Sequence, residues 1–135
     1  MFGSLDISAS ALVAQRTQLD VIAGNFANAH TTNGGHPYRR RVALLAPGNP
    51  ASGQHAPGVH VERIVADPAP FHKVYDPDHP DAIASGPDKG NVLMPNVDES
   101  TEMVNAMAAA RAYEANVTVM EITKSMAASA LRLLA

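Results

Sequence analysis

The placement of its prolines is the feature that most constrains how this chain folds. All ten lie between Pro37 and Pro95. Proline removes a backbone donor and interrupts helices, so the middle of the chain is not a helical domain. The flanks have no proline, and their periodic apolar residues predict helices. We expect a mainly α protein in which a terminal helical domain, residues 1–30 plus 96–135, carries a small β-rich outer insertion, residues 31–95.

The N-terminal flank carries a seven-residue repeat. Large apolar residues recur at this interval: Leu5, Leu12, Leu19 and Phe26. Three positions further on, two polar and two apolar residues follow the same interval: Ser8, Gln15, Ile22 and Ala29. A stripe of this kind is typical of a helix that packs along another helix. We expect the two terminal helices to pair in a coiled-coil-like layer.

The C-terminal flank carries two apolar stripes instead of one. The first consists of Ala108, Ala112, Ala115, Val119, Ile122, Met126 and Leu133. The second, about 100° around the helix, consists of Met103, Ala106, Ala110, Tyr113, Val117, Met120, Ala127, Leu131 and Leu134. A helix with one partner needs one stripe, so two stripes indicate two or more helical neighbours. A compact bundle with the middle region and an assembly of several chains both satisfy this pattern.

The composition favours burial that is shared between chains. The sequence has 24 alanines, three phenylalanines and no tryptophan. Alanine buries little apolar area, so a single subunit of this size has a thin core.

Both predicted helices have marked ends. Pro95 precedes the C-terminal helix, Asp98 is a plausible N-cap, and Glu99 and Glu102 in the first turns complement the helix dipole. Asn28 closes the N-terminal helix, because asparagine tolerates the left-handed conformation and its amide can satisfy free carbonyls.

The middle region reads as short strands and loops. The stretches YRRRVALL, GVHVERIV and FHKVYDP have alternating or β-branched character and predict strands. The stretch from Ala46 to Gly58 is rich in proline, glycine and small polar residues and predicts a flexible loop.

Composition and motifs argue against several classes of function. The chain has no cysteine, which excludes disulfides and thiolate sites, and its net charge of -3 argues against nucleic-acid binding. No nucleophile motif, phosphate loop or helical histidine pair is present, so we expect no enzyme activity, no cofactor and no small-molecule substrate. The triplet Arg39, Arg40 and Arg41 is better explained by a solvated strand or by a salt-bridging interface. No apolar run approaches the ~20 residues needed to span a membrane, and no basic start with an apolar run predicts a cleaved signal.

Three segments of the sequence resemble the bacterial flagellar rod and hook family. NFANAHTT matches the shared Asn-x-x-Asn-x-x-Thr signature after the N-terminal helix. VYDPDHPDA and MPNVDESTEMVNAMAAARAYEANV are similar to a subunit of the proximal rod. The residues that carry the resemblance are Asn25, Asn28, Thr31, Tyr75, Pro77, His79, Pro80, Pro95, Asn96, Asp98, Glu102, Met103, Arg111, Tyr113 and Asn116. The resemblance covers essentially the whole chain.

The resemblance implies a structural role in a helical shaft that transmits motor torque. It implies a position in the periplasmic part of the basal body and export without a cleaved signal peptide. The implied partners are other copies of the chain, other proximal and distal rod proteins, the MS-ring and export-gate adaptor components, and the flagellar type III export apparatus. Under this hypothesis the assembly interface includes Leu5, Leu12, Leu19, Ile22, Phe26, Met103, Ala112, Ala115, Val119, Ile122, Met126 and Leu133.

Two alternatives remain open from the sequence. One is another rod or hook-type axial subunit, against which the VYDPDHPDA segment argues. The other is a small metal-binding domain that uses His72, Asp76 and His79, with Asp78 and Asp81 nearby. A turn stiffened by Pro77 and Pro80 explains the same residues without a metal.

Overall fold

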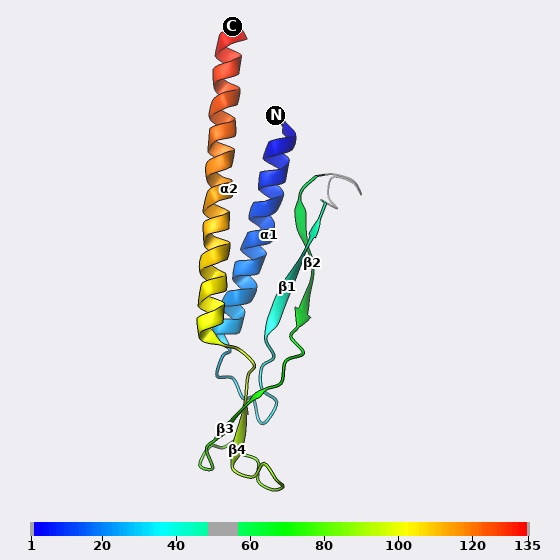
Figure 1. Cartoon of the computed structure of the whole chain (residues 1–135), viewed down its shortest axis with the longest axis vertical. Coiled ribbons are helices and arrows are strands. Elements are labelled where there is room, and N and C mark those ends of the chain that lie inside the picture. Colours follow the sequence, from blue (N-terminus) through cyan, green and yellow to red (C-terminus); the bar gives the residue numbers. More distant parts are fainter. Residues whose placement is uncertain (1, 49–56, 135) are drawn as a thin grey trace.

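The computed structural model describes residues 2–48 and 57–134 as a long, narrow molecule built from two helices and two β-hairpins (Figure 1). The helices are α1 (Phe2–Ala27) and α2 (Glu99–Leu134). The strands are β1 (Arg41–Pro47), β2 (Val59–Ala66), β3 (His72–Tyr75) and β4 (Asn91–Met94). The expected class, mainly α with a small β-rich insertion, is confirmed.

Helix α1 lies between α2 and the β1–β2 hairpin (Figure 1). The two helices run antiparallel, and the seven-residue stripe of α1 faces α2, with Ile22 buried and Leu5, Leu12 and Leu19 half-buried. The Asn116 amide of α2 donates to the Gln15 side chain of α1 at 3.3 Å. The expected pairing of the terminal helices is therefore confirmed.

Only one of the two stripes of α2 packs against α1. Tyr113, Val117 and Met120 of the second stripe are half-buried there. The first stripe is largely exposed: Val119 is 46%, Ile122 55% and Met126 63% accessible. The single chain therefore leaves a second apolar face of α2 without a partner among the described residues.

Helix α1 ends where the sequence predicts, but in a different conformation. The Asn28 amide donates to the Gly24 carbonyl at 2.8 Å and satisfies a free acceptor of the last turn. The predicted left-handed conformation of Asn28 is wrong, because its N–H still donates to the carbonyls of Gly24 and Asn25, as in a helical turn. Among the described non-glycine residues, only Asn33 has a positive φ, of 46°. The chain reverses there instead.

The β1–β2 hairpin packs along α1. Its strands are antiparallel, with a register irregularity between Leu44 and Leu45. The predicted loop from Ala46 to Gly58 starts too early, because Ala46 and Pro47 still pair with His60 and Val59 in the ladder. Residues 49–56 of that predicted loop lie outside the described residues.

The β3–β4 hairpin projects beyond the ends of the helices that lie near it (Figure 1). Its strands pair from His72 with Met94 to Tyr75 with Asn91. Gly90, at φ 82°, lies under the ring of Tyr75: a Cβ there would stand 2.9 Å from the Tyr75 Cε2 atom. Only glycine fits both the conformation and the space.

The core of the described chain is small. Its buried apolar residues are Ala14, Ile22, Ala29, Val92, Val97 and Ala109, half of them alanine. None of the helices in the described residues has the length and hydropathy of a membrane span.

Candidate functional site

A polar junction joins the end of α1, the start of β1 and the start of α2. At its centre Asn25 is 1% exposed and makes four hydrogen bonds. Its Nδ2 donates to the Arg41 carbonyl at 2.7 Å and to Glu102 Oε2 at 2.9 Å. Its Oδ1 accepts from the Arg41 N–H at 2.8 Å and from the Tyr38 hydroxyl at 3.0 Å. Both donors and both acceptors of the amide are thus satisfied.

Glu102 is the buried acid of the junction, with no exposed surface. Its Oε1 receives two hydrogen bonds from the guanidinium of Arg40, at 2.8 Å from Nε and 2.7 Å from Nη2. The Nη1 of Arg40 binds Asp67 Oδ2 at 3.1 Å. Because two nitrogens of the guanidinium converge on one oxygen of the buried carboxylate, this ion pair fixes the geometry of the segments that carry it.

Asn96 ties the segment before α2 into the same junction. Its Oδ1 accepts from the Arg40 N–H at 2.8 Å, and its Nδ2 donates to the carbonyls of Asp67 and Ala69. The same two carbonyls accept from Arg39, whose guanidinium lies 4.2 Å from the Phe71 ring centre. The chain leaving β2 is therefore held against the start of β1 and α2.

Electrostatics support the charged state of the junction. The pKa of Asp67 is lowered, first by the Ala69 N–H and then by the Arg40 guanidinium. Burial acts to lower the pKa of Arg40, but the hydrogen bonds and charges of Glu102 and Asp67 outweigh it and raise the pKa. The shifts of both partners therefore favour the Arg40–Asp67 ion pair in the folded chain.

The start of α2 is capped as the sequence predicts. Asp98 accepts from the Ser100 N–H at 3.2 Å and from the Thr101 hydroxyl. The Thr101 hydroxyl is the main cause of the lowered pKa of Asp98, and the Ser100 N–H adds to it. The cap fixes where α2 begins and so places Glu102 beside Asn25.

The structure brings together some of the predicted motif residues and separates others. Asn25, Asn96 and Glu102 meet at the junction, beside the buried Pro95. Asn28 and Thr31 form the turn after α1, where the Thr31 hydroxyl donates to Asn28 Oδ1 at 3.2 Å. Tyr113 and Asn116 face α1, whereas Arg111 is exposed. Four residues lie in the distant β3–β4 hairpin or its loop: Tyr75, Pro77, His79 and Pro80.

Two residues of the metal-binding alternative, His79 and Asp81, make hydrogen bonds within the protein. His79 Nδ1 accepts from the Asp81 N–H at 3.0 Å, and Asp81 accepts from the Thr32 hydroxyl and the Gly34 N–H. In the described part of the chain, no group of three or more metal-ligating side chains is placed to hold an ion. Every buried side-chain nitrogen and oxygen there also has a hydrogen-bond partner. The polar groups of the junction are committed to each other, which suits a structural role.

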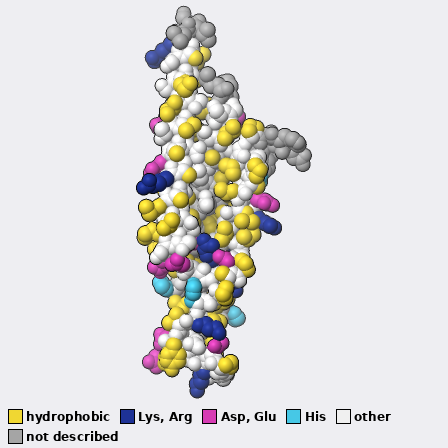
Figure 2. Space-filling view, in the orientation of Figure 1, with side chains coloured by type: hydrophobic (Ala, Val, Ile, Leu, Met, Phe, Trp, Pro, Cys, Tyr) yellow, Lys and Arg dark blue, Asp and Glu magenta, His cyan; other side chains and the backbone are white. Residues whose placement is uncertain are grey.

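The predicted interface residues fall into three groups. Leu5, Leu12, Leu19 and Ile22 line the α1–α2 contact, and Ala112 is half-buried. A hollow of about 560 Å³ along this contact is also lined by Phe26 and Met103, which are themselves largely exposed. The exposed group is Ala115, Val119, Ile122 and Met126. Hydrophobic side chains gather along the free side of α2 (Figure 2). The side chain of Leu133 lies outside the described part.

Two members of the junction, Asp67 and Arg40, could not be placed there from the sequence. Asp67 follows β2 in an ordinary Asp-Pro turn, and Arg40 belongs to a triplet whose pattern predicts a solvated strand or a salt-bridging interface. The salt bridges exist, but they are internal. Charge counting along the chain cannot find them, because Arg40 and Glu102 are 62 positions apart.

Two family models match the terminal parts of the chain. A family described as flagella basal body rod protein matches residues 5–33, and one described as flagellar basal body rod FlgEFG protein C-terminal matches residues 88–133.

Named relatives of this chain cover nearly its full length. The flagellar basal-body rod protein FlgC of Borreliella burgdorferi is 44% identical, over 99% of this chain and 97% of the relative. Its namesake in Bacillus subtilis is 42% identical, over 98% and 97%. That of Yersinia enterocolitica is 46% identical, over 95% and 93%. The chain therefore belongs to the FlgC family of flagellar basal-body rod proteins, as a structural subunit of the rod and not an enzyme.

Proposed function

We propose that the chain forms the proximal part of the rod, as a subunit of a helical shaft that transmits motor torque. One observation carries this assembly: the second apolar face of α2, with Val119, Ile122 and Met126 about half or more exposed. A folded chain that stayed alone would hold these side chains in water. Exposed apolar patches of this kind mark protein–protein contacts.

The composition of the helices supports the same proposal. Alanines on both faces of α2, such as Ala109 toward α1 and Ala115 on the free side, let neighbouring helices approach closely. A helical shaft requires contacts that join unlike surfaces, so the free face of α2 would meet a different surface of the next copy. Such contacts build rings or helical assemblies instead of closed dimers.

The polar junction supports a role in carrying load. It ties residues from both helices and from the middle region by hydrogen bonds and a buried ion pair. Torque applied to the helices would therefore pass to the outer region without a flexible linker.

Rod proteins of this family assemble with other rod subunits, and the finer set of partners is part of the proposal. It consists of other copies of the chain and neighbouring rod proteins, the MS-ring and export-gate adaptor components at the base, and the flagellar type III export apparatus as the route to the periplasmic space. The support for this set is the family membership.

A charge on the free face of α2 tests the proposal. Ile122→Asp would bury a carboxylate in the interface, which costs on the order of several kcal/mol unless the charge is paired. We expect the variant to fold but to be absent from purified basal bodies, with loss of swimming. The control is Lys124→Asp, an exposed position about 160° around the helix from Ile122. Normal swimming and incorporation of Ile122→Asp would contradict the proposed interface.

A further inference from the structure

Arg111 is a charged residue whose side chain has no interaction partner within the described part of its own chain. It is exposed, and within the described residues it forms no ion pair or side-chain hydrogen bond. Nine positions, about two and a half helical turns, separate it from Glu102. Because Glu102 is buried against α1, Arg111 points to the opposite, free side of α2.

Asp20 on α1 is a residue of opposite charge that likewise lacks an ion-pair partner in the described chain. It too is exposed and has no ion-pair partner in the described chain, not even Arg16 one turn before it. It borders hollows on both sides of α1, one toward Met103 of α2 and one toward Ile64 of β2. Asp20 therefore stands on an open crest of α1, between the two elements that cover its flanks.

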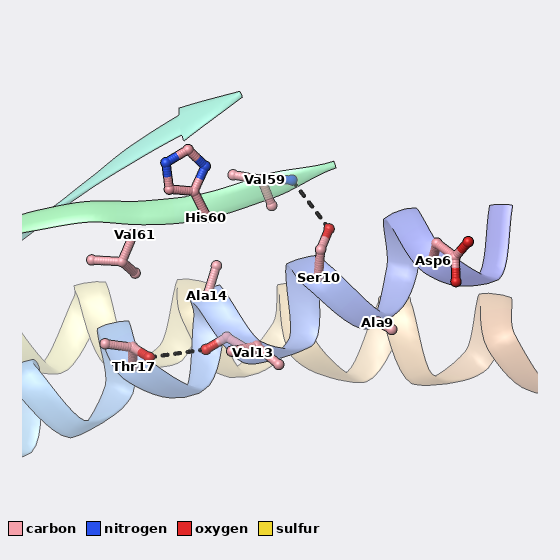
Figure 3. Close-up of a pocket in the computed structure, with 9 residues that line it drawn as sticks. All are labelled: Asp6, Ala9, Ser10, Val13, Ala14, Thr17, Val59, His60 and Val61. Atoms are coloured by element: carbon pink, nitrogen blue, oxygen red, sulfur yellow. Dashed lines mark hydrogen bonds between the residues drawn. The ribbon is translucent and has the colours of Figure 1, made fainter. Parts of the chain in front are cut away.

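The same crest continues toward the N-terminus of α1. Figure 3 shows Ser10 and Ala14 pointing toward β2, where the Ser10 hydroxyl accepts from the Val59 N–H at 3.1 Å. The neighbouring hollow, about 530 Å³, is bordered by Ala9 and Val13, both exposed. This open strip of α1, from Asp6 through Ala9, Val13, Arg16 and Asp20 to Ala27, is called the α1 crest below.

Arg111 and Asp20 lie at the same height along the molecule. The hydrogen bonds Gln15–Asn116 and Asn25–Glu102 fix how the antiparallel helices match. Asp20 lies between Gln15 and Asn25, and Arg111 lies between Asn116 and Glu102. Their heights therefore agree to within about one helical turn, roughly 5 Å.

We infer that Arg111 of one copy pairs with Asp20 of the next copy, docking the free face of α2 onto the α1 crest. The inference rests on the proposed function, and it identifies the surface that the free face of α2 contacts in the assembly. The charges are opposite, both are unused within the chain, and a sideways displacement brings them together without a shift along the axis. A second copy of this chain is thus the occupant.

The shapes of the two faces agree with this register. In antiparallel helices, residues at equal height have residue numbers with a constant sum. The Gln15–Asn116 bond sets this sum at 131. At the same sum, Val104 of the neighbour comes opposite Ala27 and Ile122 comes opposite Ala9. Val104 and Ile122 are large and exposed, whereas the two alanines are small and border hollows of about 560 and 520 Å³.

The two docking surfaces point in different directions. Leu19 faces α2, and Asp20 is the next residue, about 100° further around α1. Each copy therefore presents the crest at about a quarter turn from its free α2 face. Repetition of this contact turns successive copies around an axis, as a ring or a helix requires, and does not close a dimer.

Cysteine cross-linking tests the pairing, because the chain has no cysteine of its own. Asp20→Cys combined with Arg111→Cys is made the only copy in a motile strain, and purified basal bodies are oxidised and run on a non-reducing gel. We expect dimers and larger species of the chain, which each single-cysteine variant lacks. The control pair is Asp20→Cys with Ser129→Cys, since Ser129 lies on the same side of α2 about five turns, roughly 27 Å, beyond Arg111.

The outcomes separate this inference from the proposed function. Incorporated chains that give no dimer with the 20/111 pair, or that cross-link through the 20/129 pair instead, would overturn the docking and leave the rod role intact. Absence of the unmodified chain from basal bodies would contradict the proposed function itself.

Exchange of the charges gives a second, independent readout. Asp20→Arg and Arg111→Asp each place like charges together, so each should cause loss of the swimming halo. The double exchange restores opposite charges and should recover the halo. Normal swimming by both single variants, or no recovery in the double exchange, would overturn the pairing even where a cysteine variant fails to assemble.

Discussion

At the residue scale, this chain uses asparagine amides to join backbone segments that no regular ladder connects. Asn25 and Asn96 each offer a donor and an acceptor on one planar group. Asn25 binds the N–H and the carbonyl of Arg41, and Asn96 binds the Arg40 N–H and the carbonyls of Asp67 and Ala69. An aspartate at either position could only accept, and a leucine could do neither. The amides therefore explain why these two positions matter, without any catalytic or binding role.

The conformation of the turn after α1 predicts how two other asparagines respond to substitution. Asn28 lies in the turn after α1 without a positive φ, and its N–H keeps a helical bond to the Gly24 carbonyl. Asn28→Gly should therefore destabilise more than Asn28→Ala, by up to about 1 kcal/mol, because glycine loses more backbone freedom on folding. Asn33 has φ 46°, so Asn33→Gly should be nearly neutral, and Asn33→Val should cost about 1–2 kcal/mol. Urea unfolding of the purified variants measures both pairs. A milder effect of glycine than of alanine at position 28 would instead support a left-handed conformation of Asn28.

At the element scale, the β3–β4 hairpin depends on a few ties to the rest of the chain. The Thr32 hydroxyl and the Gly34 N–H donate to Asp81, and the Lys73 ammonium pairs with Asp88 at 2.8 Å within the hairpin. The hairpin projects past the helices (Figure 1), and β3 is exposed along its whole length, whereas Val92 of β4 is buried. The polar contacts add to its attachment, and solvent conditions can change them.

The tie through Asp81 should weaken in acid. The Thr32 hydroxyl, and after it the Gly34 N–H, lowers the pKa of this carboxyl in the folded chain. The stabilisation is therefore complete above the unfolded-state pKa of about 3.9 and is lost as pH falls through the lower folded value. Asp81→Asn should remove this acid dependence and speed proteolysis of the hairpin at neutral pH.

Limited proteolysis between pH 3 and 6 with an acid-active protease measures this loss. The control is Asp78→Asn, an exposed neighbour without a hydrogen bond in the described chain. Equal acid profiles for the unmodified chain and Asp81→Asn would show that this tie does not hold the hairpin.

The sequence predicts the elements of this fold better than their contacts. Both helices and three strands follow from proline placement and periodicity, because these depend on neighbours along the chain. The buried face of α2 could not be predicted, since both of its stripes are apolar and only the position of α1 selects one. The conformation of Asn28 was also missed, because the amide bond to Gly24 is compatible with a helical ending.

At the scale of the whole molecule, the polar junction compensates for a thin core. The helices and the middle region share few buried apolar residues, and alanine is prominent among them. The largest fully buried side chain is instead Glu102, held by Asn25 and Arg40. The relative placement of helices and hairpins thus rests on directed polar bonds.

Removal of one partner of the buried ion pair should be costly. Glu102→Met leaves the Arg40 guanidinium without the oxygen that accepts two of its hydrogen bonds and Asn25 without one of its partners, so we expect a loss of about 3 kcal/mol or more. Arg40→Met combined with Glu102→Met should cost less than the sum of the two single changes. Urea unfolding of the four chains in this cycle measures the coupling.

The exposed pair Lys73–Asp88 serves as the comparison. Lys73→Ala should cost less than about 1 kcal/mol, because exposed ion pairs contribute little. Equal losses at Lys73 and Glu102 would mean that the junction contributes no more than a surface contact.

The bond between Asn25 and Glu102 also sets an order of events for a growing chain. It spans 77 positions, and closing a loop of that length costs roughly 4 kcal/mol in chain entropy before any constant term. In a nascent chain that emerges with its N-terminus first, Asn25 appears early. Its hydrogen-bond partner Glu102 appears only in the last third of the chain. Until then α1 has neither its helical partner nor its buried anchor. The polar junction therefore cannot form until residue 102 of 135 has emerged, and the relative placement of helices and hairpins is completed only after that point.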